Sequence, residues 1–305
     1  MAQSGLKSGL QLGIHQGVKS GLTLAPLKSG MLSGRKENIT NKDKFQNPQF
    51  LYGIKQPLAL FNGDNVPLDT GNTPSNTVFD SLISGFNSSY ENNITNLITS
   101  TSKLITIDPN LNLKRSFDFA TNASAVYSNA PAAILSNTRA ISFTVIIKPT
   151  IINTSLNKTV VFEKNITTSL NSRIECSIEP DFSVKVVYYD TANTAISITY
   201  KSLPNSILLN KYYMITVTID SQIKNTISDP IKIYINGKLN SYYSSGSCLG
   251  TPNDFATGNF YIGSTSSGTG NGSYIAAALV SEYAYSDIER IRIENYFRWY
   301  YGNKF

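Results

Sequence analysis

The chain has 305 residues, of which 41% are hydrophobic and only 15% are charged, so it can bury the core of one large domain and still carry an appended segment. Isoleucine, threonine and tyrosine are abundant, and because these residues suit pleated, half-buried surfaces, the composition favours an all-β fold. The sequence has no apolar run long enough to span a bilayer and none that resembles a signal peptide, which excludes an integral membrane protein and predicts a soluble protein made in the cytosol.

The positive charge is confined to the first 55 residues. This segment contains eight of the 26 lysine and arginine residues and two of the 20 acidic residues, so it carries the whole net charge of +6, and the other 250 residues are neutral. A basic segment favours acidic surfaces or phosphate as partners. Because no segment can span a bilayer, we expect no contact with membranes, and we expect no contact with nucleic acid outside this basic segment.

Three copies of an apolar-Lys-Ser-Gly-apolar unit lie within the same segment, beginning at Leu6, Val18 and Leu27. Their spacing of twelve and then nine residues is too irregular for a solenoid, whose repeats stack in fixed register. Glycine and serine at this density cannot offset the entropy of ordering with a core of their own. The segment is therefore either a flexible tail or an arm that docks on a partner. The docking interpretation assigns partner contacts to Leu6, Lys7, Leu10, Val18, Lys19, Leu22, Leu27, Lys28 and Met31.

Residues 56–305 are predicted to form the folded domain. Residues 75–100 allow two interpretations, because apolar residues recur there at helical spacing while part of the same stretch fits an opening strand and loop. From residue 140 onward, short β-branched and aromatic runs alternate with Asn, Asp, Pro or Gly, which predicts a succession of strands. The predicted strands cover residues 140–148, 159–164, 173–178, 183–190, 195–201, 212–220, 231–236, 260–264 and 273–285.

The strongest hairpin signal is the pair Asn236-Gly237, since these residues supply the two positive-φ positions of a type I′ turn. A chain of roughly ten to thirteen short strands at this spacing is typical of a two-sheet sandwich.

A helix is predicted after the last strand. Ser286 and Glu289 have the spacing of a capping box, and Gly302 supplies a helix stop. One apolar stripe follows at i, i+3, i+4 and i+7, formed by Ile293, Tyr296, Phe297 and Tyr300. We expect Trp299 to pack the helix on the sandwich.

These last residues carry a resemblance to a known family. Ile275-Ala276 followed by Ser286-Asp287-x-Glu289-Arg290 and Glu294-x-Tyr296-x-x-Trp299-x-Tyr301-Gly302 resembles the C-terminal signature of laminin-G-like (concanavalin A-like) jelly rolls. The run 58–62 with Phe79-Asp80 and Ser84-Gly85-x-Asn87 is similar to the opening strand and loop of that family, and residues 111–119 are similar to its next strand and turn. The resemblance therefore implies strands over 58–62 and 111–119. The resemblance covers about residues 57–302 and implies an antiparallel two-sheet jelly roll with the helix folded back on it. It also implies a binding or structural module, which is what most family members are.

Groups for catalysis are largely missing. The single histidine, His15, lies in the arm, so Ser-His-Asp and Cys-His nucleophile systems lack a base, and histidine-rich metal sites are excluded. Glu175, Glu179 and Asp181 do not reproduce the carboxylate pattern of jelly-roll glycanases. We therefore predict that the protein is not an enzyme. Whether Cys176 and Cys248 pair depends on whether the fold brings them together.

Binding residues are easier to nominate. Tyrosines near strand ends suit glycan binding, and the candidates are Tyr189, Tyr212 and Tyr243. Neighbouring tyrosines on a strand point to opposite faces, so one of each adjacent pair is expected in the core. We expect no cofactor; a calcium site resembling that of laminin-G domains would draw on Asp254 or Asp229.

Together these features predict a virion structural protein of a bacteriophage, such as a head-fibre, capsid-decoration or tail-associated protein. In this interpretation residues 1–55 anchor the chain to other virion proteins in a multi-copy assembly. The sandwich then projects outward and binds host glycans. The alternative is a free carbohydrate-binding adhesin module with the arm as a linker, and a glycan hydrolase comes third.

Overall fold

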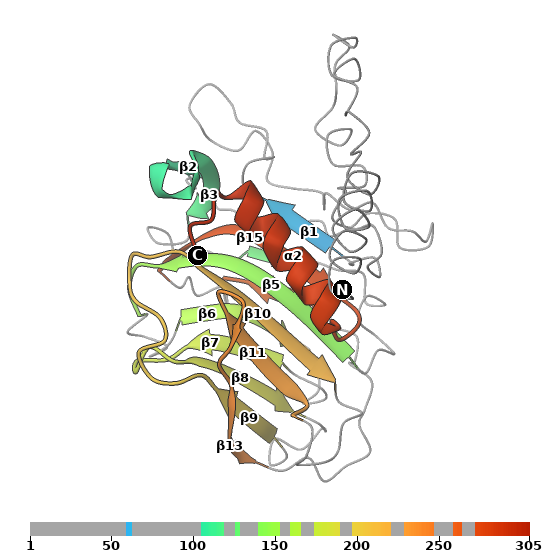
Figure 1. Cartoon of the computed structure of the whole chain (residues 1–305). Helices are drawn as coiled ribbons and strands as arrows, with labels where there is room; N and C mark the ends of the chain where they lie inside the picture. Colours follow the sequence, from blue (N-terminus) through green and yellow to red (C-terminus); the bar gives the residue numbers. More distant parts are fainter. Residues whose placement is uncertain are drawn as a thin grey trace, which may run out of the picture. The chain divides into compact units, whose positions relative to one another are not determined.

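The computed structural model describes residues 59–62, 105–118, 126–128, 140–152, 159–165, 174–189, 197–220, 229–246, 259–263 and 272–305. These residues form two antiparallel β-sheets and one C-terminal helix (Figure 1). The predicted all-β, two-sheet sandwich with a short C-terminal helix is confirmed. The proposed arm, residues 1–55, lies outside the described residues, as does the ambiguous stretch 75–100. In the part of the chain that the structure describes, no helix is long and apolar enough to cross a membrane.

The first sheet is organised around β5 (Ala140–Pro149), its longest strand. β5 pairs with β10 (Tyr213–Asp220) on one side and with β15 (Ser273–Ser281) on the other, both far from it in the sequence. Such long-range antiparallel pairs are typical of jelly rolls. The sheet continues through β11 (Ile231–Ile235) and β12 (Lys238–Leu239) beyond β10, and through β3 (Lys114–Asp118) and β2 (Ile105–Asp108) beyond β15, with β1 (Ala59–Asn62) also paired to β15.

The second sheet contains a meander of four strands joined in sequence order, β6 to β9. Its edge strand, β13, follows β12 directly, so the chain passes from one sheet to the other between them. β2, β4, β12 and β13 were not predicted as strands; β4 and β12 have only three and two residues, and β13 ends in serine and glycine. Across the sheet the strands are β13 (Tyr242–Gly246), β9 (Ser197–Lys201), β8 (Val184–Tyr189), β7 (Ile174–Ile178), β6 (Thr159–Asn165), β14 (Asn259–Ile262) and β4 (Val126–Ser128).

The core lies between the two sheets. Alternate residues of β5, such as Phe143, point into it, and the ring of Phe143 stacks on that of Phe162 in β6 with 4.4 Å between the ring centroids. Burying one such side chain contributes about 1.5–3 kcal/mol. The thiol of Cys176 belongs to the same core and is free. Its proposed partner, Cys248, lies outside the described residues.

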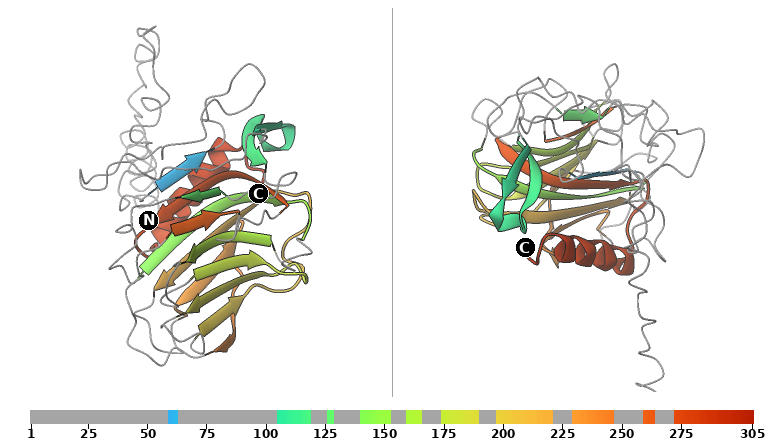
Figure 2. Two further views of the ribbon diagram at one scale, coloured as in Figure 1. Left: turned by 180° about the vertical axis from the view of Figure 1, so that it is seen from behind. Right: turned by 90° about the horizontal axis from the view of Figure 1, so that it is seen from above.

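A second, smaller core forms where α2 (Asp287–Tyr300) covers the outer face of the first sheet, as Figure 2 shows. The predicted capping box is confirmed, because Ser286 and Glu289 each bond the other's backbone N–H. Gly302 ends the helix with a φ of +76°. The packed side chains are Ile293, Phe297 and Tyr301 from the helix end of the chain, and Ile146, Met214, Ala277 and Leu279 from the sheet.

The prediction that Trp299 packs the helix on the sandwich is wrong. Trp299 is 74% exposed, whereas Phe297 and Tyr301 are fully buried. At 100° per residue, Trp299 lies roughly opposite the face that carries Ile293 and Phe297. The predicted stripe is confirmed, because Ile293 and Phe297 are fully buried and Tyr296 and Tyr300 are half-buried against the same core.

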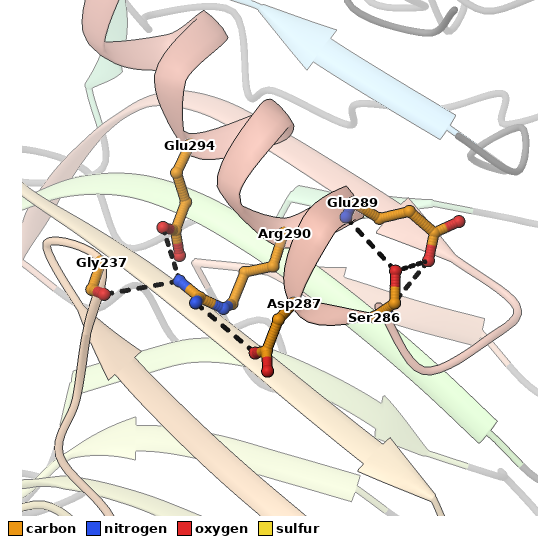
Figure 3. A network of polar contacts seen from close by, with 6 residues as sticks. All are labelled: Gly237, Ser286, Asp287, Glu289, Arg290 and Glu294. Atoms are coloured by element: carbon orange, nitrogen blue, oxygen red, sulfur yellow. Dashed lines mark hydrogen bonds and ion pairs between the residues drawn. The ribbon is translucent and has the colours of Figure 1, made fainter. Parts of the chain in front are cut away.

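The buried face of α2 also contains charge. Arg290 is buried with Glu294, one helical turn away, and its Nη1 donates to a Glu294 carboxylate oxygen at 2.7 Å (Figure 3). The same nitrogen donates to the carbonyl oxygen of Gly237 at 3.4 Å, and Arg298 donates to that of Asn236 at 2.7 Å. Two arginines of α2 therefore hold the turn between β11 and β12. Both turn residues have positive φ, +53° and +81°, which confirms the predicted hairpin.

Two predicted strand boundaries are corrected. The strand predicted over 273–285 ends at Ser281, since the following residues turn under the helix, where the backbone N–H of Tyr285 donates to the Ser142 hydroxyl. The strand predicted from residue 111 begins at Lys114, because residues Pro109–Leu111 form a 3₁₀ turn capped by Asp108.

Candidate binding site

The most exposed aromatic strand that the structure describes is β13. All five of its residues are exposed, with Tyr242 at 42% and Tyr243 at 52%. β13 is an edge strand, so one side of its backbone pairs with β9. Adjacent strand residues point to opposite faces, and the two tyrosines therefore present rings on both sides of the edge.

The start of β13 is held in place by Asn240. Its backbone N–H donates to the carbonyl oxygen of Ile233, and its side-chain Oδ1 accepts from the N–H of Leu203 at 3.1 Å. Its Nδ2 donates to the Ser206 hydroxyl at 3.0 Å. Asn240 thus ties the chain leaving the first sheet to the loop that follows β9, which orients the tyrosine pair that comes two residues later.

Tyr243 lies on the inner side of the edge, over Tyr200 of β9. The two rings meet edge-to-face with 5.9 Å between centroids, and Tyr200 itself is buried. The Tyr200 hydroxyl donates to Oδ1 of Asp229 at 3.1 Å, and Asp229 is exposed. Two residues nominated from the sequence, Tyr243 and Asp229, therefore both contact Tyr200, which was not nominated.

Tyr242 lies on the outer side of the edge, at the end of a cross-strand row. The register places it opposite Lys201 of β9, and Lys201 opposite Lys185 of β8. Lys185 forms an ion pair with Glu179 at 3.3 Å, and Glu179 also accepts from the Ser177 hydroxyl at 2.8 Å. We call Tyr242, Lys201 and Lys185 the tyrosine–lysine row. Neither lysine was nominated from the sequence.

The positive charge of Lys201 acts on Asp181, an exposed residue of the turn between β7 and β8. The pKa of Asp181 is lowered mainly by the hydroxyl of Ser183, which donates to it, against a raising effect of burial. The N–H of Ser183 and the charge of Lys201 lower it further.

The other nominated tyrosines lie elsewhere. Tyr212 is 6% exposed, so its proposed role as a glycan platform is corrected. It is buried under α2, where its hydroxyl donates to that of Ser116 at 3.2 Å and its ring lies 5.0 Å from Nζ of Lys148, which is paired with Asp108. Tyr189 is half-buried at the end of β8, on the face of Lys185 but four residues, or about 13 Å, along the strand.

The acidic candidates do not form a catalytic or metal site in the described part of the chain. Glu175 and Glu179 lie four residues apart along one chain segment, and Glu179 is already bonded to Ser177 and Lys185. The carboxylate of Asp229 accepts from Tyr200, and Asp254 lies outside the described residues. Among the described residues, no group of three or more His, Cys, Asp and Glu side chains could hold a metal ion. The calcium site considered from the sequence stays a prediction.

No model of a known protein family matches the chain, and no curated protein matches it in sequence. Solved structures that resemble it include the CBM40 module of a Ruminococcus gnavus IT-sialidase bound to α2,3-sialyllactose, which is 15% identical with a TM-score of 0.44, covering 57% of this chain and 94% of that one. The binding domain of botulinum neurotoxin serotype G is 15% identical with a TM-score of 0.43, covering 65% and 45%.

A Trypanosoma rangeli sialidase is 10% identical with a TM-score of 0.41, covering 59% of this chain and 27% of the sialidase. This chain therefore spans about a quarter of that sialidase and less than half of the neurotoxin domain. At these identities and scores, the likeness assigns neither a family nor a ligand to this chain.

Proposed function

We propose that the sandwich is a non-catalytic carbohydrate-binding module that binds sugar at the edge strand β13. The observation that carries the proposal is the pair of adjacent exposed tyrosines, Tyr242 and Tyr243, at 42% and 52% exposure. A tyrosine ring offers a flat apolar face with a hydroxyl at its rim, which matches a sugar ring with C–H groups on its face and hydroxyls around it. Tyrosine also loses little conformational entropy on binding, because it has only two side-chain torsions.

The surroundings of the tyrosine pair support this proposal. Asn240 fixes the start of the strand through three hydrogen bonds, and Tyr200 supports Tyr243 from the core side. A site held rigid before binding loses less entropy when the ligand arrives. The Asp229 carboxylate adds an acceptor near Tyr243, suited to sugar hydroxyl groups.

A glycan array probed with the full chain tests the proposal. We expect Tyr242→Ala and Tyr243→Ala each to weaken binding about tenfold, or about 1.4 kcal/mol, because each removes a stacking face. Trp299→Ala is the matched control, since it removes an exposed aromatic ring from α2, away from β13. Binding that is unchanged in both tyrosine variants, or the absence of any bound glycan, would refute the proposal.

We further propose that residues 1–55 anchor the chain to a larger assembly, as in a virion structural protein. The specific support is the threefold apolar-Lys-Ser-Gly-apolar repeat in a segment of net charge +6. Deletion of residues 1–40 is expected to abolish incorporation into the particle while leaving the sandwich folded by circular dichroism. Normal incorporation of the shortened chain would show that the segment is only a linker.

A further inference from the structure

The tyrosine–lysine row places two positive charges side by side next to an exposed ring. Lys185 and Lys201 are direct neighbours on adjacent antiparallel strands, and so are Lys201 and Tyr242. The Cβ atoms of such neighbours lie about 5 Å apart. All three side chains belong to the outer face of the second sheet. Val186, next to Lys185 in β8, and Tyr200, next to Lys201 in β9, point into the core, and adjacent strand residues point to opposite faces.

Two like charges directly opposite each other destabilise a sheet unless something offsets them. Glu179 offsets Lys185 through the 3.3 Å ion pair. Lys201 has no ion pair within 4.0 Å among the residues that the structure describes. The charge of Lys201 lowers the pKa of Asp181. A carboxylate oxygen of Asp181 already accepts from the N–H and the hydroxyl of Ser183, at 3.0 and 2.6 Å.

The position of Lys201 matters more than its charge alone. It lies between Tyr242, 42% exposed, and Lys185, so a ligand resting on the ring of Tyr242 reaches the Lys201 ammonium next. An ammonium group forms its strongest hydrogen bonds with ionised oxygen atoms, and those to neutral hydroxyl groups are roughly half as strong. The row is therefore built to distinguish an acidic sugar from a neutral one.

We infer that the ligand at β13 is an acidic glycan, with a sugar ring on Tyr242 and a carboxylate or sulfate group bound by Lys201 and Lys185. This inference rests on the proposed glycan-binding function and specifies the class of its ligand. Tyr242 supplies the contact area, and the two lysines supply the selectivity for charge. Because part of the interaction is between charges that are only half-buried, the affinity falls as the ionic strength rises.

An array of matched glycan pairs tests the inference, using the full chain. Each pair contains an acidic glycan and its neutral parent: a sialylated glycan with its desialylated form, a sulfated glycan with its unsulfated form, and a uronate oligomer with its methyl ester. We expect the acidic member of at least one pair to bind at least about tenfold more tightly than its parent. Lys201→Met is expected to remove most of that preference, and Lys201→Arg to retain it.

Lys232→Met is the matched control, since Lys232 is an exposed strand lysine of the other sheet. Because the basic residues 1–55 are identical in all variants, any anion binding by them is the same in each. Thermal unfolding verifies that each variant is folded. Neutral and acidic members bound equally, with loss in Tyr242→Ala, would overturn the inference and leave the proposed function standing. Acidic preference that survives Lys201→Met and Lys185→Met would also overturn it. If no glycan binds, the proposed function itself fails, and the inference with it.

Discussion

Gly237 shows how a missing side chain lets a helix and a hairpin approach each other. A Cβ atom at this position would lie 2.3 Å from Nη2 of Arg298 and 3.0 Å from a carboxylate oxygen of Glu294. Its φ of +81° is also one that other residues rarely adopt. The hydrogen bonds that α2 makes to the β11–β12 turn therefore require glycine here.

We expect Gly237→Ala to lower the free energy of unfolding by about 2 kcal/mol, from backbone strain of about 1 kcal/mol and from displacement of Arg298. Gly302→Ala is the matched control, because Gly302 has a similar φ of +76° but its added Cβ would meet Asn112 only at 3.2 Å. Backbone strain alone predicts a loss of about 1 kcal/mol for the control. Urea denaturation measures both, and equal losses would contradict the role of Arg298.

Asp108 predicts how stability depends on pH. Burial raises the pKa of Asp108, but the hydrogen bonds from Lys148 and from the N–H of Asn110 outweigh it, so the pKa is lowered overall. A carboxyl whose pKa is lower in the folded state stabilises the fold above its unfolded pKa of about 3.9, and this contribution is lost as the pH falls through the folded value.

The wild-type protein should therefore lose part of its unfolding free energy below about pH 4 through this residue. In Asp108→Asn, which cannot ionise, we expect a shallower loss over the same range, together with lower stability at neutral pH because the pair with Lys148 is broken. Denaturant titrations at a series of pH values measure both slopes. Parallel slopes in the two proteins would show that Asp108 does not contribute.

At the scale of single elements, one face of α2 is expected to contribute to stability and the other is not. Phe297 is fully buried against the first sheet, and Trp299 is 74% exposed. We expect Phe297→Ala to lower the free energy of unfolding by about 3–5 kcal/mol and Trp299→Ala to change it by less than about 0.5 kcal/mol. Chemical denaturation of the two variants compares them directly. A loss above about 1 kcal/mol for Trp299→Ala would contradict this, and would mean that its ring contacts with Tyr296 and Tyr300 stabilise the fold.

The same helix shows where periodicity reaches its limit. The capping box, the stop at Gly302 and the core positions Ile293 and Phe297 could be predicted, because each depends on local spacing. The burial of Arg290 and Glu294 could not, since charged residues are assigned to the solvent side unless their partner is known. Here each is the other's partner one turn away, and the ring of Tyr234, 4.0 Å from the Arg290 guanidinium, completes the packing. The buried face of α2 therefore includes Arg290 and Glu294, and Trp299 lies on the other side of the helix.

At the scale of the whole molecule, the strands could be predicted more completely than the site. The long strands of both sheets contain β-branched runs that mark them individually. The tyrosine–lysine row instead combines residues of three strands, and only the pairing register brings Lys185, Lys201 and Tyr242 together. Strand parity could have placed each of them on an outer face, but nothing local indicates which residue lies opposite which. β13 itself was missed because three of its five residues are serine or glycine, which carry no strand signal.

Ligand binding should also be visible in the stability of the whole sandwich. A ligand that binds the folded state alone stabilises it by about 2.7 kcal/mol at a concentration one hundred times its dissociation constant. We therefore expect a bound glycan to raise the melting temperature of the wild type, and to raise that of Tyr242→Ala much less. A scanning fluorimetry titration measures the shift. An equal shift in the two proteins would place the bound sugar away from β13.

The free thiol of Cys176 allows the opening of the sandwich to be measured by alkylation. The side chain lies fully enclosed between the sheets, and this burial raises the pKa of the thiol, so an alkylating reagent is excluded while the layers stay closed. In a Cys248→Ser background, the rate at which iodoacetamide alkylates Cys176 measures how often β7 separates from the first sheet. We expect the alkylation rate to follow the rate of global unfolding across a denaturant series. Alkylation much faster than global unfolding would show that the sandwich opens locally.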